Sequence, residues 1–524
     1  MITSFFSASD YQAIKPEILL AMFGLAILLF DFLLDKRDKY MNALTALAGL
    51  ALAGLKLGMF WVAMGGAGYH GFGGVFVLDS FAIFAKFIIV VATAIVVLLS
   101  VKYLEIEHAN LGEYYALLLF SAVGMMFLAS GTDLIVLFIA LELMALCEYV
   151  LTGFLRGNRR SNEAAVKFFL LGAFSSGLLL YGMSLLYGIG GSTNLLVIAQ
   201  RLSDRPVHDP LAWIAMITLL AGIYFKVAAV PFHQWTPDAY EGAPTSITAF
   251  ISVAPKVASF AFFIRILIAG LWPLRAEWQV LTIGVAIATM TLGNLAAITQ
   301  TNIKRFFGYS TIAHVGYLLL GLVAAADGNR EGLTAIAIYL LVYAFMNLGA
   351  FAVIIVMRRK DLIGDEIDDF SGLMSRAPGM AILMLIFLLS LAGIPPTAGF
   401  IGKYFIFLSL IETGHYYLAV LAVAYAVVAL YYYFRIVVAM FMRKAGEAVP
   451  LATGAGIRVA LAVTLSMTLV VGVYPEPFIL IAREAIRPFF MLGTGSTLRI
   501  TCGYPWQRSR QTSGPRWGFT RAWV

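Results

Sequence analysis

Three ionisable residues, Glu142, Lys226 and Lys256, stand inside long apolar segments of the chain. If such a segment crosses a membrane, a charge near the bilayer centre costs about 3 kcal/mol on insertion scales, and the residue becomes a candidate for function. A carboxylate beside a buried lysine helps to decide whether the lysine keeps its proton. The chemistry predicted from these residue types is therefore proton transfer between glutamate and lysine side chains.

Three more residues extend this set. Lys403 follows the paired prolines Pro395 and Pro396, and His233 follows a proline within a polar stretch. Histidine titrates near neutral pH and can pass a proton between its two ring nitrogens, which favours a relay role for His233. Lys167 stands near the start of its apolar segment, so a side chain that reaches the membrane surface is the competing interpretation.

Two further candidates have weaker support. His314 lies within an apolar segment, where a hydrogen-bonded packing residue is the alternative to a relay role. Glu148 comes six residues after Glu142, which places it about 120° further round a helix, so the two carboxylates do not share a face. Asp79 is expected to be a structural residue in contact with water, and Arg265 to anchor the outer interface.

The segments that carry these residues must cross a membrane. The chain is 61% hydrophobic and 12% charged, whereas soluble domains carry about 25% charged residues, so soluble and disordered classes are excluded. A spanning helix needs about 20 apolar residues, and fourteen candidate segments meet this length near 17–35, 41–63, 79–100, 112–130, 132–155, 163–188, 211–230, 244–271, 278–299, 304–325, 332–357, 378–410, 416–442 and 456–475. The predicted fold is an all-α polytopic membrane protein.

The loops indicate an orientation, because Lys and Arg residues gather on the cytoplasmic side of membrane proteins. In this chain they gather in the odd-numbered loops, for example at Lys36 and Arg37, at Arg159 and at Arg358. Both termini are therefore expected on the outer side of the membrane. The first apolar segment has no basic stretch before it, and we interpret it as a membrane span that is not cleaved.

Prolines interrupt the seventh segment after Val230 and the twelfth at Pro395–Pro396. Such breaks persist in a membrane only where other protein groups or water satisfy the freed backbone. Two breaks five spans apart are typical of an inverted repeat, here of segments 4–8 and 9–13. We predict an N-terminal part, two repeats, a last helix and an Arg-rich tail, with boundaries at 1–110, 111–275, 276–445, 446–498 and 499–524.

Several classes of site have no pattern in the sequence. The chain has no phosphate-binding loop, no dinucleotide fingerprint and no nucleophile–base set. With two cysteines and six scattered histidines, it offers no ligand set for an iron–sulfur cluster or a metal. We therefore expect no cofactor in this chain and no nucleic-acid partner, and we expect its energy to come from a gradient or from another subunit.

The residues also carry a resemblance to a known family. The stretches responsible are LELM at 141–144, EAAVKFFLLGAFSSG at 163–177, FKVAAVPFHQWTPD at 225–238, EGAPT at 241–245 and GIPPTAGFIGK at 393–403. With them the chain resembles the antiporter-like membrane subunits of respiratory complex I and of multisubunit cation/proton antiporters. The match covers roughly 75–445, and Lys403, where other branches carry Glu, favours the subunit N branch.

The resemblance implies fourteen helices with broken helices 7 and 12, and proton translocation across a bacterial inner membrane. It also implies partners: other complex I membrane subunits and, through them, the hydrophilic NADH-oxidising arm, with NADH, FMN, iron–sulfur clusters and quinone bound in those subunits and membrane lipid around this one. The family's charged positions fall on Glu142, Lys167, Lys226, His233, Lys256 and Lys403.

The sequence departs from the family at two places. An apolar residue is usual where Glu148 stands, and Ser is usual where Ala145 stands. The segment 499–524 has five arginines and no acidic residue, and we interpret it as an altered reading of the sequence, with a partner-contacting tail as the alternative.

Two other functions stay open at this point. One is a subunit of a multisubunit sodium/proton antiporter, which cation exchange by the chain without NADH would favour. The other is a membrane scaffold without transport, which the costly buried charges disfavour.

Overall fold

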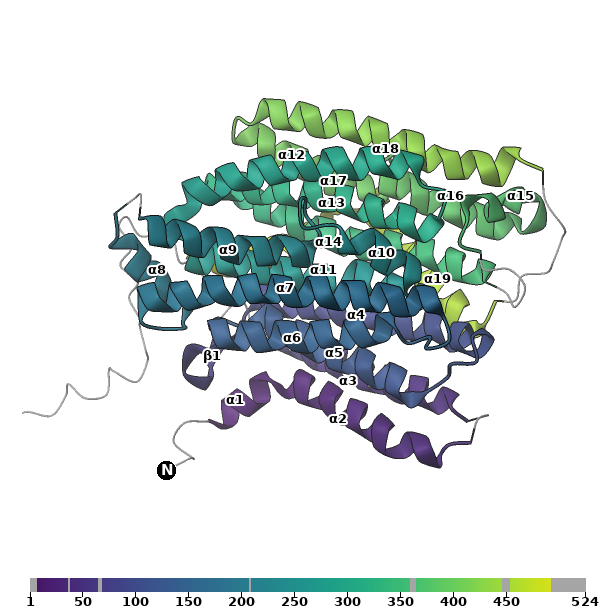
Figure 1. Cartoon of the computed structure of the whole chain (residues 1–524), viewed down its shortest axis with the longest axis horizontal. Helices are drawn as coiled ribbons and strands as arrows, with labels where there is room; N and C mark the ends of the chain where they lie inside the picture. The colour runs from purple at the N-terminus through teal and green to yellow at the C-terminus, as the bar shows by residue number, and fades with distance from the viewer. Residues whose placement is uncertain are drawn as a thin grey trace, which may run out of the picture.

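Long runs of Leu, Ile, Val, Phe and Ala can satisfy their backbone groups within a membrane by forming helices, and most of this chain is helical. The computed structural model describes residues 7–35, 38–64, 68–206, 209–358, 364–444 and 453–491. Within these ranges the long helices run side by side in one bundle (Figure 1). The predicted Arg-rich tail at 499–524 lies outside the described residues.

The first part of the chain combines helices with a small antiparallel hairpin, in which Tyr69 pairs with Leu78 and Gly71 with Phe76. Its elements are α1 (Ala8–Ala13), α2 (Lys15–Phe30), α3 (Tyr40–Met64), β1 (Tyr69–Gly71), β2 (Phe76–Leu78) and α4 (Ser80–Ile106). The short 3₁₀ turns here are η2 (Asp31–Leu33) and η3 (Phe72–Gly74).

The rest of the described chain is helical. The first predicted repeat contains α5 (Gly112–Ser130), α6 (Leu134–Thr152), α7 (Arg159–Gly190), α8 (Leu195–Ser203), α9 (Pro210–Val227), α10 (Trp235–Gly242) and α11 (Thr245–Arg265), which the π-helical turn η4 (Ile266–Gly270) extends. The 3₁₀ turn η5 (Trp272–Leu274) ends the first predicted repeat. The second contains α12 (Arg275–Thr299), α13 (Ile303–Ala326), α14 (Arg330–Met357), η6 (Ile367–Phe370), α15 (Leu373–Arg376), α16 (Pro378–Ala392), α17 (Ala398–Glu412) and α18 (Tyr416–Met442). The last described helices are α19 (Ala455–Val473), α20 (Glu476–Ile486) and α21 (Pro488–Met491).

The prediction of an all-α polytopic membrane protein is confirmed. Thirteen helices of the described ranges are long and apolar enough to cross a membrane. The twelfth predicted segment, 378–410, forms the two 15-residue helices α16 and α17 instead, because the predicted proline break divides it. The predicted boundary at 110/111 falls between α4 and α5, whereas the one at 275/276 falls after the first residue of α12, and the division stays a prediction.

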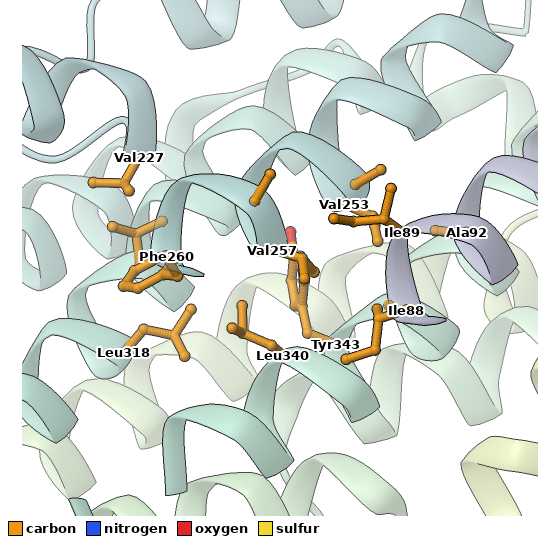
Figure 2. Close-up of a cluster of buried hydrophobic side chains, with 14 of the residues drawn as sticks. Ile88, Ile89, Ala92, Val227, Val253, Val257, Phe260, Leu318, Leu340 and Tyr343 are labelled. Atoms are coloured by element: carbon orange, nitrogen blue, oxygen red, sulfur yellow. The ribbon is translucent and has the colours of Figure 1, made fainter. Parts of the chain in front are cut away.

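The helices α11, α13 and α14 form the centre of the bundle, whereas α2, α3, α18 and α19 lie at its edges (Figure 1). On α11, Val257 and Phe260 pack in an apolar cluster with Leu318 of α13 and Leu340 of α14 (Figure 2). Because these central side chains are almost fully buried, a polar group placed among them must find a partner or carry a high energetic cost.

Two helix breaks interrupt this bundle at the predicted places. After α9, Ala228 adopts a left-handed conformation with φ 66°, and after α16 Gly393 does so with φ 87°. The freed backbone groups find partners inside the protein: Val230 N–H donates to Thr289 Oγ1 over 3.0 Å, and Gly399 N–H donates to Ser390 Oγ over 3.1 Å. Protein groups thus supply the partners that a break in a membrane requires.

Buried ion pairs tie the N-terminal helices to the central helix α11. Glu17 Oε1 of α2 lies 2.5 Å from Lys86 Nζ of α4, and Arg265 of α11 forms a pair with Asp79 at 2.8 Å. The expectations of a water-exposed Asp79 and of an interfacial anchor at Arg265 are wrong, since both residues are buried. The hairpin and α4 bring a carboxylate to the arginine, so its charge is neutralised inside the protein.

Candidate functional site

The site is built around the two helix breaks. Lys226 is the last residue but one of α9, directly before the left-handed turn, and its side chain is 8% exposed. Its Nζ lies 5.9 Å from the centre of the Tyr149 ring on α6. Glu142 lies on the same helix α6, two turns before Tyr149, and its predicted coupling to Lys226 stays a prediction.

Lys256 of α11 is held against the same break. Its Nζ donates a hydrogen bond of 2.9 Å to the carbonyl of Val227, the last residue of α9. The indole ring of Trp235, which opens α10, lies 5.0 Å from this ammonium group. Since the C-terminal end of a helix carries partial negative charge and an aromatic face attracts a cation, the break itself solvates the lysine.

Lys403 has a matching environment at the second break. Its Nζ donates to the carbonyls of Ala392 and Leu391, over 2.7 and 3.1 Å, at the end of α16. The ring of Tyr317 lies 5.1 Å away. Each break thus presents carbonyl oxygens and an aromatic ring to one buried lysine, an arrangement that can hold an ammonium group without a fixed carboxylate.

Glu142 is half-buried on α6. It accepts a hydrogen bond from Ser176 Oγ of α7 at 2.5 Å. The sequence does not single out Ser176 as a site residue, although it lies in the Phe-Ser-Ser-Gly stretch on which part of the resemblance rests. A hydroxyl aimed at a carboxylate orients it, so Ser176 is a positioning residue for Glu142.

The two histidines occupy different surroundings. His233 lies half-buried in the turn between α9 and α10, and its Nδ1 has no hydrogen-bond partner among the described residues. His314 on α13 is buried, and its ring nitrogens lie 2.7 Å from the Tyr339 hydroxyl and 3.1 Å from the Tyr433 hydroxyl. The His314 ring lies 6.3 Å from the ring of Tyr317, which also contacts Lys403, and this shared neighbour places the histidine beside the second break.

Lys167 lies at the surface of α7, whereas Lys226, Lys256 and Lys403 are buried. Its Nζ forms ion pairs with Glu163 at 2.9 Å and with Asp238 at 3.2 Å. Arg305 continues this network by pairing with Asp238 and Glu241. The fold therefore brings Lys167 into a surface charge network, and does not bring it into contact with Lys226 or Lys256.

Glu148 occupies a more central position than its sequence context indicates. It is 4% exposed. The angular argument compares Glu148 with Glu142 alone, and does not take into account that α11, which carries Lys256, packs against α6.

The fold and the lysines at its two breaks define an antiporter-like membrane protein. Residues 131–429 match the family model described as NADH:quinone oxidoreductase/Mrp antiporter, transmembrane. The chain is 55% identical over 488 residues to NADH-quinone oxidoreductase subunit N 2 of Solibacter usitatus, covering 92% of this chain and 98% of the relative. It is 53% identical over 491 residues to subunit N 1 of Koribacter versatilis, covering 92% and 96%.

A solved structure agrees with these relatives. A chain of respiratory complex I from Thermus thermophilus is 31% identical, with a TM-score of 0.76 over 89% of this chain and 99% of that one. The protein belongs to the subunit N family of bacterial NADH-quinone oxidoreductases. A chain of the Mrp complex from Dietzia is 21% identical with a TM-score of 0.76, and this likeness concerns the fold alone.

Proposed function

We propose that the chain is the proton-translocating membrane-arm subunit of an NADH:quinone oxidoreductase. The observation that carries the proposal is the pair of helix breaks, each with a buried lysine held against its backbone carbonyls. A static scaffold gains nothing from such groups, because each buried charge costs several kcal/mol unless it is paired. The relatives named NADH-quinone oxidoreductase subunit N support the assignment to this enzyme.

In the proposed mechanism the buried lysines exchange protons in turn. Water on the cytoplasmic side loads the region of Lys256 and His233, and Lys226 passes charge under the control of Glu142. Lys403 then exchanges a proton with the outer side. Each transfer changes the charge that the next group experiences, so the groups titrate as a coupled set and not one by one. Lys167 stays in the proposed relay on the strength of the resemblance, although its ion pairs with Glu163 and Asp238 lie at the surface.

The energy for this transfer comes from partner subunits. NADH oxidation with FMN and iron–sulfur clusters, and quinone reduction, take place in those subunits, and the chain described here performs no redox step. Other membrane subunits connect it to the hydrophilic arm. The chain lies in the bacterial inner membrane in lipid, with both termini on the periplasmic side.

Proton pumping in inverted membrane vesicles tests the assignment. With Lys226→Ala or Glu142→Ala, we expect NADH-driven proton uptake per NADH oxidised to fall while the complex still assembles. Lys102→Ala is the control, because Lys102 is an exposed lysine paired with Glu105. Unchanged pumping in a normally assembled Lys226→Ala complex would overturn the assignment.

The sodium/proton antiporter alternative is tested separately. The purified chain in liposomes is given a sodium gradient in the absence of NADH, and internal pH is followed. We expect no sodium-dependent proton flux. A flux that disappears with Lys226→Ala would favour the antiporter instead.

A further inference from the structure

A groove of about 320 Å³ opens on the outside of the bundle along α2, α5 and α6. Its walls are apolar, and they are formed by Leu28 of α2, Leu117 and Phe120 of α5, Val150 of α6, and Phe154 just after α6. Leu28 and Val150 are exposed. Among the residues that line the groove, none belongs to the proposed relay. The groove is therefore a separate feature of the molecule.

Close contacts between α2 and α5 fix the shape of the groove. A Cβ at Gly24 of α2 would lie 2.8 Å from Phe120 Cε1, and a Cβ at Gly112 of α5 would lie 2.6 Å from Asp31 Cβ. Small residues let two helices approach closely within a membrane, and these two contacts are about two turns apart. Leu28 lies on α2 between them. The groove thus follows from the packing of the helices, and a ligand would find it preformed.

One positive and one negative side chain line the same groove. Arg156 lies in the turn between α6 and α7, and Glu113 lies in the first turn of α5. Both are exposed, and within the described ranges neither side chain forms an ion pair. Each charge is therefore available to a group of opposite charge on a ligand.

These two charges lie at the end of the bundle where lipid headgroups are expected. Arg156 precedes Arg159 in one of the loops that gather Lys and Arg, on the side that we propose to be cytoplasmic. Helix α5 starts at this side, and Phe120 follows Glu113 by seven residues, which places it about 10 Å deeper along the helix axis. Charges at headgroup level and apolar walls at hydrocarbon depth match the two parts of a phospholipid.

We propose that the groove binds one phospholipid whose headgroup carries a primary ammonium group, as in phosphatidylethanolamine. The guanidinium group of Arg156 binds the phosphate, whose geometry it matches. The Glu113 carboxylate accepts a hydrogen bond from the ammonium group. An acyl chain lies along Leu117 and Phe120, and the lipid joins α2 to α6. This site goes beyond the proposed function, since its occupation does not depend on proton translocation.

The pair of opposite charges distinguishes this occupant from two others. An anionic phospholipid offers a phosphate to Arg156 but no cation to Glu113, whose negative charge repels it. An apolar helix of another subunit would cover the walls of the groove, but it would leave both charges desolvated without a partner. A zwitterionic headgroup with a primary ammonium group gives each charge a partner.

Photocrosslinking in the assembled complex tests this site. The complex is placed in nanodiscs of phosphatidylcholine, whose methylated ammonium group cannot donate a hydrogen bond, with a trace of phosphatidylethanolamine that carries a photoactivatable group on an acyl chain. We expect labelled peptides that contain residues 117–120. Unlabelled phosphatidylethanolamine should compete for the site, and phosphatidylglycerol should compete about tenfold less well, which is the loss expected for one hydrogen bond to a charged group.

Two variants and a matched control show whether the charges select the lipid. Arg156→Gln and Glu113→Gln should each lower the labelling about tenfold, for the same reason. Arg159→Gln removes an exposed arginine that does not line the groove, and should leave the labelling unchanged. With photoactivatable phosphatidylglycerol, Glu113→Gln should raise the labelling whereas Arg156→Gln should lower it. NADH oxidation by each variant complex shows that it has assembled.

Two results would overturn the proposal. Labelling of residues 117–120 that both variants leave unchanged would show that the lipid only surrounds the protein. Absence of this labelling in the wild-type complex would show that the lipid does not enter the groove, and crosslinks from a photoactivatable side chain at position 150 to another subunit would then identify a helix as the occupant. Neither result concerns proton pumping, so the proposed function would stand.

Discussion

At the residue scale, the protein holds two buried lysines at its helix breaks by backbone groups, whereas the buried Lys86 is held by a carboxylate. Lys256 and Lys403 each donate to carbonyls at the end of a broken helix. A carbonyl solvates an ammonium group without binding a proton itself, so the lysine can lose its proton without leaving an unpaired carboxylate behind. This arrangement is suited to a group whose charge changes during the reaction.

Gly393 tests this arrangement at the second break. It has φ 87°, and a Cβ at this position would lie 2.8 Å from Lys403 Cδ. Gly393→Ala should therefore displace the lysine from the Ala392 carbonyl and lower pumping while the complex assembles, at a cost in stability of about 1–2 kcal/mol for the left-handed backbone. The matched variant is Ala228→Gly, where the same conformation already carries a Cβ. In detergent, the thermal unfolding midpoint should fall with Gly393→Ala and rise with Ala228→Gly. Equal pumping in the two variants would contradict this account.

At the element scale, charge pairs help to decide which helices associate, because apolar faces alone do not distinguish one neighbouring helix from another. Hydrophobic contacts do not drive helix association within lipid, so polar contacts carry much of the specificity. The Glu17–Lys86 pair joins α2 to α4, and the Asp79–Arg265 pair joins the start of α4 to α11. Arg265 Nε also donates to the Ala129 carbonyl at 2.6 Å, which adds α5 to the same contact.

A double-mutant cycle on Glu17 and Lys86 measures how much their ion pair contributes to the stability of the subunit. Lys86→Met alone leaves a buried carboxylate without its partner and should destabilise the subunit by about 3–5 kcal/mol. Glu17→Leu combined with Lys86→Met should recover most of that loss, because both charges are then absent. The thermal unfolding midpoint of the purified complex measures the stability lost when the α2–α4 contact is broken.

The exposed pair Lys102–Glu105 provides the control cycle for this experiment. Its coupling should be at most about 1 kcal/mol, as is usual for surface pairs. A double variant at Glu17 and Lys86 that is as unstable as the single variant would show that packing, and not charge pairing, dominates at this site.

At the scale of the whole molecule, the helices of both breaks pack against the buried centre: α9 contacts α11, α10 contacts α13, and α16 and α17 contact α14. His314 of α13 and Lys403 share the neighbour Tyr317, and His314 contacts Tyr339 of α14 and Tyr433 of α18. The polar groups of the second break therefore extend into the central helices. We expect one path with two lysine stations, as in the proposed mechanism, instead of two independent paths.

If protons pass the two breaks in series, the losses of pumping caused by variants at the two breaks should not add. Lys226→Ala and Lys403→Ala should each remove this subunit's contribution to pumping, and the double variant should lose no more than either single one, because groups that act as one unit are not additive. Proton uptake per NADH in vesicles measures all three. Losses that add in the double variant would indicate two parallel paths through the two repeats.

The amino-acid sequence by itself determined the membrane class, the positions of both helix breaks and the identity of the lysines near them. These features are local, since twenty apolar residues, a proline pair or one charge within an apolar run act over a few turns. Only the tertiary structure decided which of these groups meet. It buried Glu148 within the bundle, placed Lys167 at the surface, and set Asp79 against a buried Arg265. Helical periodicity orients a side chain about its own axis, whereas its partners depend on how the neighbouring helices pack.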